Sequence, residues 1–128
     1  MKAVAQLVYA ALAADSTLPK IYWENVDSSL PTTEHLIVSL AQTEAGDNFL
    51  GTTSQNIYLL NINIGVKAGV GQIKAMDIGD KLILLFKKNT ILQASPLVSV
   101  DVTPTYGTGY YDEKWYRIPL RILINAII

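Results

Sequence analysis

The strictest constraint on the fold is an alternating stretch near the C-terminus, WYRIPLRILI, at residues 115–124. Successive side chains of a strand point to opposite faces, so this period of two predicts a β-strand. One face would carry Tyr116, Ile118, Leu120, Ile122 and Ile124. The other would carry Trp115, Arg117, Pro119, Arg121 and Leu123. Because proline has no N–H to give to a neighbouring strand, we expect an edge strand, or one that is interrupted at Pro119.

Three further segments show strand signals. Residues 55–66 alternate in the same way, with one face of Tyr58, Leu60, Ile62 and Ile64. Residues 21–26 and 35–42 are rich in β-branched and aromatic side chains, and we expect them to pair as a hairpin with a long loop. A further strand near residue 100, before the last one, would point three side chains inward: Val98, Val100 and Val102.

Two segments show the period of an amphipathic helix. The first stripe is Val4, Leu7, Val8, Ala11 and Leu12, which favours a folded helix over a secretion signal. The second stripe is Ala75, Ile78, Gly79, Leu82, Leu85 and Phe86. A glycine inside a helix costs about 1 kcal/mol relative to alanine, so we expect Gly79 to permit close contact with a neighbouring element.

These segments predict an α+β fold: a mixed, mainly antiparallel sheet of about five strands with two helices packed on it, in the order α-β-β-β-α-β-β. The chain has 128 residues, half of them hydrophobic, which is the size of one domain covering residues 1–128. No segment has the ~20 consecutive apolar residues that a membrane span needs.

Composition argues against most kinds of catalytic or ligand site. The chain has no cysteine, which excludes disulfides, thiolate metal sites and a cysteine nucleophile. His35 is the one histidine, and we interpret it as a partly exposed structural residue. The glycine-rich stretch at residues 65–74 lacks the spacing of a dinucleotide fingerprint or a P-loop. We therefore expect no cofactor, no metal and no catalytic residue.

An aromatic and charged cluster precedes the last strand: Tyr110, Tyr111, Asp112 and Glu113. Adjacent carboxylates on an extended chain point apart, so they do not suit joint acid–base work. Stacking of bases is one interpretation, although the net charge of -1 and the lack of a basic stripe count against it. A protein interface fits better, because tryptophan, tyrosine and arginine are enriched in interfaces.

The predicted subunit or tube interface therefore joins this cluster to the outward face of the last strand: Trp115, Arg117, Arg121 and Leu123. The alternative for that face is a covering helix within the same chain. A second contact candidate is the aperiodic loop at residues 42–54, with Asp47, Asn48 and Phe49. On this interpretation, alanine at Trp115 and Arg117 would weaken assembly and leave the monomer folded.

The order and spacing of four motifs resemble the tail terminator-like proteins of long-tailed bacteriophages. They are WENV at residues 23–26, LGT at 50–52, the glycine-rich turn into a helix at 65–82, and WYRIPLRI at 115–122. The resemblance implies a structural protein that forms a ring, commonly of six subunits, which caps the tail tube and ends its polymerisation. The ring would also present a docking surface for the head–tail connector.

The resemblance also implies the partners and the location. The partners would be other copies of the chain, the major tail tube protein and the connector. DNA would pass through the lumen without specific binding, with which the near-neutral charge is compatible. The protein would be assembled in the cytoplasm of the bacterial host and end in the virion tail.

Two alternatives stay open. One is another neck, tail-completion or head–tail joining protein. The other is a small ligand-binding domain or enzyme, which would show a deep pocket with converging polar groups.

Overall fold

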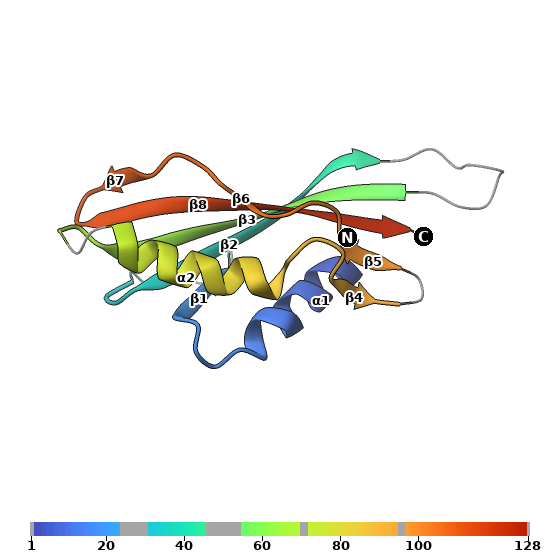
Figure 1. The fold of residues 1–128 in the computed structure, drawn as a ribbon, viewed down its shortest axis with the longest axis horizontal. Helices are drawn as coiled ribbons and strands as arrows, with labels where there is room; N and C mark the ends of the chain where they lie inside the picture. The colour runs from blue at the N-terminus through green and yellow to red at the C-terminus, as the bar shows by residue number, and fades with distance from the viewer. Residues whose placement is uncertain (1, 24–30, 46–54, 70–71, 95–96, 128) are drawn as a thin grey trace.

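The computed structural model describes residues 2–23, 31–45, 55–69, 72–94 and 97–127 (Figure 1). Within them one sheet carries two helices on the same side. The elements in chain order are α1 (Lys2–Ala13), β1 (Lys20–Trp23), β2 (His35–Ala45), β3 (Gln55–Lys67), α2 (Gln72–Leu85), β4 (Ile91–Gln93), β5 (Val98–Val100), β6 (Thr105–Tyr106), β7 (Tyr110–Asp112) and β8 (Trp115–Ile127). The predicted α+β class is confirmed, but the described sheet has eight strands rather than about five.

The sheet is mixed, and one of its pairings differs from the prediction. Its order is β1-β2-β3-β8-β5-β4, with β6 and β7 also paired to β8. β1 runs parallel to β2, so the expected hairpin of the two is wrong. Sequence signals give each strand its period but not its direction. A connection as long as residues 24–34 allows the chain to return to the end where β1 began.

β8 is a central strand, and the predicted edge position is wrong. It pairs with β3 along its whole length, from Lys67↔Trp115 to Gln55↔Ile127, and its other side meets β7, β6 and β5 in turn. Pro119 is tolerated because of its orientation. Its carbonyl accepts a hydrogen bond from the Gly107 N–H on the β6 side, at 2.7 Å. The N and O of one strand residue point to the same side, so the missing N–H faces the break between β6 and β7.

The core lies between the sheet and the two helices. The predicted inner face of β3 is confirmed, since Leu60, Ile62 and Ile64 are fully buried. The even-numbered apolar residues of β8 lie in the same core cluster. The helices contribute the predicted stripes, with Val4, Val8 and Leu12 buried on α1 and Ala75, Gly79 and Leu82 buried on α2. Burial of each large side chain contributes about 1.5–3 kcal/mol to folding. No described helix is long and apolar enough to cross a membrane.

The strand near residue 100 is shorter than expected. Val98 and Val100 are buried, but β5 ends at Val100 and Val102 is 41% exposed, so the inward position of Val102 is wrong. The chain leaves the ladder there: the last bond on this segment is from the Asp101 N–H to the Leu123 carbonyl.

Gly79 makes the close contact predicted for it. A methyl group at this position would lie 2.6 Å from Cε1 of Tyr106, whose ring packs on the helix backbone. The Tyr106 hydroxyl donates to the Asp80 carboxylate at 2.9 Å, and it also lies 3.3 Å from the Met76 carbonyl. Burial and the Asp80 bond raise the pKa of Tyr106, so the hydroxyl stays protonated as the donor. This contact joins β6 to α2.

We expect Gly79→Ala to destabilise the protein by up to about 2 kcal/mol. The clash with Tyr106 costs about 1–3 kcal/mol, and the helix preference of alanine returns about 1 kcal/mol. Urea unfolding would be measured for Gly79→Ala in the wild-type chain and in a Tyr106→Ala background. The comparison separates the cost of the clash from the helix preference of alanine. In the double variant the same glycine change should become neutral or stabilising. An equal cost in both backgrounds would contradict the contact.

Candidate functional site

The helix-free face of the sheet carries a row of residues that meet over a glycine. β2, β3 and β8 bring His35, Gly65 and Arg117 into register. Because Gly65 has no side chain, the two flanking side chains reach one another across the middle strand. A methyl group at Gly65 would lie 2.6 Å from both Cε1 and Nε2 of His35 and 3.1 Å from a terminal nitrogen of Arg117. The glycine is therefore a requirement of this contact.

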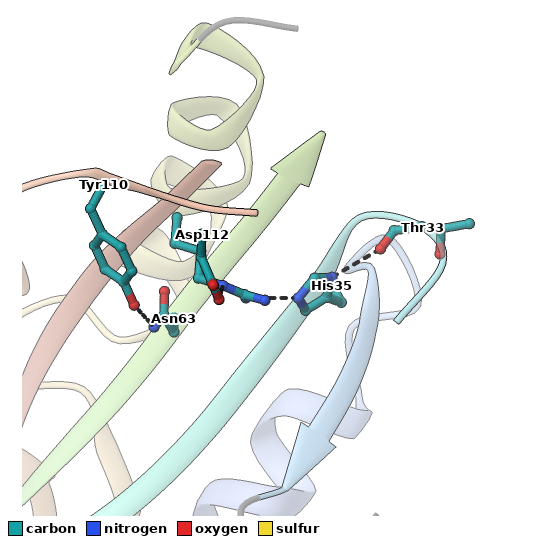
Figure 2. Close-up of polar contacts among 6 residues, drawn as sticks. Thr33, His35, Asn63, Tyr110 and Asp112 are labelled. Carbon is teal, nitrogen blue, oxygen red and sulfur yellow. Dashed lines mark hydrogen bonds and ion pairs between the residues drawn. The ribbon is translucent and has the colours of Figure 1, made fainter. Parts of the chain in front are cut away.

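A chain of hydrogen bonds runs through this row, and Figure 2 shows its members. A terminal nitrogen of Arg117 lies 2.9 Å from Nε2 of His35, and Nδ1 of His35 lies 2.9 Å from the Thr33 carbonyl. Arginine can only donate and a carbonyl can only accept. The imidazole is therefore neutral, with its proton on Nδ1. Nε of Arg117 also donates to the carboxylate of Asp112 at 2.9 Å.

His35 is fully buried, so its predicted partial exposure is wrong. Burial lowers the pKa of His35, the bond to the Thr33 carbonyl raises it, and the Arg117 guanidinium lowers it again. The net shift is downward. Protonation would place a second cation beside Arg117 and remove the acceptor that Arg117 uses.

Aromatic rings close this end of the sheet. The Trp115 ring meets His35 edge to face, with centroids 4.7 Å apart, and Tyr22 of β1 meets the same imidazole at 5.8 Å. Two shallow hollows flank Trp115. One, of about 310 Å³, is lined by Pro31, Asp112, Glu113, Lys114, Trp115 and Arg117. The other, of about 350 Å³, is lined by Thr32, Lys67, Ala68, Lys114 and Trp115.

The β7–β8 hairpin is held onto the sheet by side chains. The amide nitrogen of Asn63 donates to the Tyr110 hydroxyl at 2.9 Å, as Figure 2 shows. Asp112 and Trp115 pair at the hairpin end, and Glu113 begins the turn with a φ of 54°. Few L-residues adopt this backbone conformation. On the opposite face, Tyr111 packs on Tyr116 with centroids 5.0 Å apart.

The structure separates the predicted interface residues into groups. Trp115 and Arg117 do lie on the face away from the helices, but they are only 5% and 7% exposed. The exposed candidates are Tyr110, Tyr111, Asp112, Glu113 and Arg121, and Leu123 is half-buried. Arg121 and Leu123 lie farther along β8, away from the hairpin. Asp47, Asn48 and Phe49 fall outside the described residues. The interface role of all these residues stays a prediction.

The pairing of His35 with Arg117 was missed by sequence reasoning. One signal was available, since a glycine within an alternating strand indicates a close approach. Gly65 was instead assigned to the glycine-rich turn. In addition, no group of three or more metal-binding side chains occurs among the described residues.

Two arginines on one face of β8 give a matched comparison. We expect Arg117→Ala to destabilise the protein by about 2–3 kcal/mol, since it removes a buried charge from His35 and Asp112. Arg121→Ala, at an exposed position, should change stability by at most about 0.5 kcal/mol. Urea unfolding of the two variants checks this. Equal effects would contradict the buried network. The sequence alone predicted that alanine at Trp115 and Arg117 would leave the monomer folded. The burial of Arg117 predicts a loss of monomer stability instead.

The lowered pKa of His35 predicts a pH dependence of stability. The unfolded chain binds the proton near the ordinary pKa of 6.5, while the folded chain binds it only at lower pH. The free energy of unfolding should therefore be at its full value above that pH and fall as the pH drops towards the folded pKa. Urea unfolding between about pH 8 and about pH 5.5 measures the loss.

His35→Gln is the control for this pH series. Its amide can donate to Thr33 and accept from Arg117 without titrating. Its stability should stay level over the same window. The pKa values of Glu34 and Asp15 are lowered by hydrogen bonds to Lys74 and Thr17. Their contributions to the free energy of unfolding are therefore lost only at more acidic pH. A wild-type curve as level as that of the variant would contradict the neutral, buried imidazole.

Comparison with known proteins gives the family. A family model described as phage tail terminator protein matches residues 1–123. No curated protein matches the chain.

Two solved structures share the fold. One, which has no descriptive name, is 19% identical, covers 95% of this chain and 94% of its own, and has a TM-score of 0.69. The other belongs to the virion of a native gene transfer agent particle; it is 14% identical, covers 94% of this chain and 92% of its own, and has a TM-score of 0.63. At these identities the likeness shows the fold alone.

The match of the family model covers nearly the whole chain, and the family is one of structural tail proteins. The chain therefore belongs to the phage tail terminator protein family and is a structural component of the virion tail.

Proposed function

We propose that this protein forms a ring of six copies that caps the tail tube and ends its polymerisation. The ring would also present the docking surface for the head–tail connector. The observation that carries the proposal is the family match over residues 1–123. The partners would be further copies of the chain, the major tail tube protein and the connector, with assembly in the cytoplasm of the bacterial host.

The described surface suits contacts with proteins more than binding of a small ligand. Large apolar side chains are exposed at separate places, including Ile73 and Leu84 at 74% each and Tyr111 at 73%. Such groups are favourable at an interface that excludes water. The hollows around Trp115 are shallow, and Arg117 and Asp112, which line one of them, are paired with each other. A head–tail joining protein of another kind remains the second candidate.

The charge of the chain is compatible with a ring lumen that does not bind DNA. The whole chain carries a formal net charge of -1, and the two described ion pairs use Lys74 with Glu34 and Arg117 with Asp112. A lumen that gripped the DNA backbone would present unpaired cations in a row. DNA would therefore pass without specific binding.

The proposed function predicts a limit on tube growth. We expect the purified protein, added to polymerising major tail tube protein, to shorten the tubes and to be seen as a ring at one tube end in electron micrographs. The physical reason is that a capped end offers no free surface for the next tube ring. Tubes of unchanged length, with no ring at their ends, would contradict the proposal. Binding to the connector instead of the tube would favour the second candidate.

A further inference from the structure

The outer surface of α2 carries a ridge of apolar and acidic side chains that nothing in the described chain covers. Its members, Ile73, Asp77, Asp80 and Leu84, recur at three- and four-residue steps and are all exposed. This spacing places them on one stripe, opposite the buried stripe of Ala75, Gly79 and Leu82. Ile73 and Leu84, each 74% exposed, would be buried if a partner packed along this ridge.

The order along this ridge is apolar, acidic, apolar. Ile73 and Leu84 lie at its ends, about 16 Å apart along the helix. Asp77 and Asp80 lie between them. Asp80 accepts a hydrogen bond from Tyr106, whereas Asp77 has no ion pair among the described residues. A partner must therefore offer a cation between two apolar groups.

The helix-free face of the sheet has that pattern with the opposite charge. In register, Arg121 lies in a row with Ser39, Asn61 and Thr105. One adjacent row is Ala41, Leu59 and Leu123, and the other is Ile37, Asn63 and Pro119. These two rows, which are apolar apart from Asn63, are about 13 Å apart along the strands. Arg121 is exposed and has no ion pair in the described part of the chain, although Asp101 lies near Leu123.

Unused hydrogen-bonding groups lie on the same face. The side-chain oxygens of Asn61, Asn63 and Asn125 are buried and have no hydrogen-bond partner within the described structure. Unpaired buried acceptors are unfavourable, and native structures hold few of them. Figure 1 shows both helices on the other side of the sheet. The described helices therefore leave this face, with its unpaired amide oxygens, open to a partner.

We propose that α2 of one subunit packs on the helix-free sheet face of the next, with the acidic ridge against Arg121. This rests on the proposed ring, and it names the surfaces by which the copies join. Two different surfaces meet, so the contact is heterologous, as a closed ring requires. Each α2 then lies between its own sheet and that of its neighbour, and the apolar ends of the ridge cover the rows of Leu123 and Pro119.

Charge reversal tests the pairing. Asp77→Arg puts an arginine on the α2 ridge as well as on the sheet face of each subunit. Arg121→Asp puts an aspartate on the sheet face as well as on the α2 ridge. We expect each variant to assemble about tenfold or more weakly, because like charges then meet at every interface. Both positions are exposed, so circular dichroism and urea unfolding should show the fold of the wild type. Lys88→Asp, at another exposed position, has the same charge change as Arg121→Asp and should assemble normally.

Mixing the two variants is the decisive measurement. In a mixed ring, α2 of an Asp77→Arg subunit, with its new arginine, meets the acidic sheet face of an Arg121→Asp subunit. The unchanged acidic α2 of the Arg121→Asp subunit meets the unchanged Arg121 of the next Asp77→Arg subunit. The equimolar mixture should therefore recover the wild-type ring mass by light scattering, with the variants in equal number by native mass spectrometry. Neither variant should do so alone.

The outcomes separate this inference from the function on which it rests. Rings formed by each variant alone, or a mixture that stays unassembled while the wild type assembles, would overturn the packing of α2 on the sheet and leave the ring proposal standing. A wild-type chain that remains monomeric, alone and with tail tube protein, would overturn the proposed function and this interface with it.

Discussion

The bond between Arg117 and His35 over Gly65 is the constraint on which one end of the molecule depends. A guanidinium that is 7% exposed must be paired, because an unpaired buried charge is costly. Its partners come from β2 and β7, two strands that lie on either side of the β3–β8 pair. A shift of one residue between any two of these strands would turn Arg117 or His35 to the other face. The network therefore fixes the register of the long strands at the end where β8 begins.

The same network divides the helix-free face into two parts. At the hairpin end, Trp115, His35 and Arg117 fill the space above the sheet and leave little for a partner to bury. In the middle, where Arg121 is exposed and Leu59 and Leu123 are half-buried, no described element covers the strands. A partner would gain most by binding to the middle. Of the residues predicted for the interface, Trp115 and Arg117 are buried within the subunit, whereas Tyr110, Tyr111, Asp112 and Glu113 are exposed at the hairpin.

Features with a local period were predictable from the sequence, and features that depend on strand pairing were not. The inner face of β3, the inner face of β8 and both helix stripes follow from side-chain spacing alone. The contact of Gly79 was inferred because glycine is unfavourable in a helix without such a reason. By contrast, the central place of β8 depends on which strands lie beside it. Pro119 wrongly indicated an edge strand. It is tolerated in a central strand because its missing N–H faces the break between β6 and β7.

The burial of two predicted interface residues was missed for the same reason. Alternation placed Trp115 and Arg117 on the correct face, but it could not show that His35, 82 residues away in the chain, covers them. Exposure on one face of a strand depends on its neighbours in the sheet, and those neighbours are set by the whole topology. Arg121 lies four residues after Arg117 on the same face of β8. It is exposed because its neighbours in register are the smaller side chains of Asn61, Ser39 and Thr105.

The long axis of the sheet has a consequence for the proposed ring. The β7–β8 turn lies at one end of the long strands, and the end of β2 and the start of β3 lie at the other (Figure 1). If neighbouring subunits join through α2 and the sheet face, their contacts use the sides of the molecule and leave both strand ends free. Tube and connector would meet a ring from opposite directions, so a subunit needs two separate surfaces beyond those that bind its neighbours. In that arrangement the two ends of the strands would remain for the tube and the connector, and the hairpin anchored by Arg117 lies at one of them.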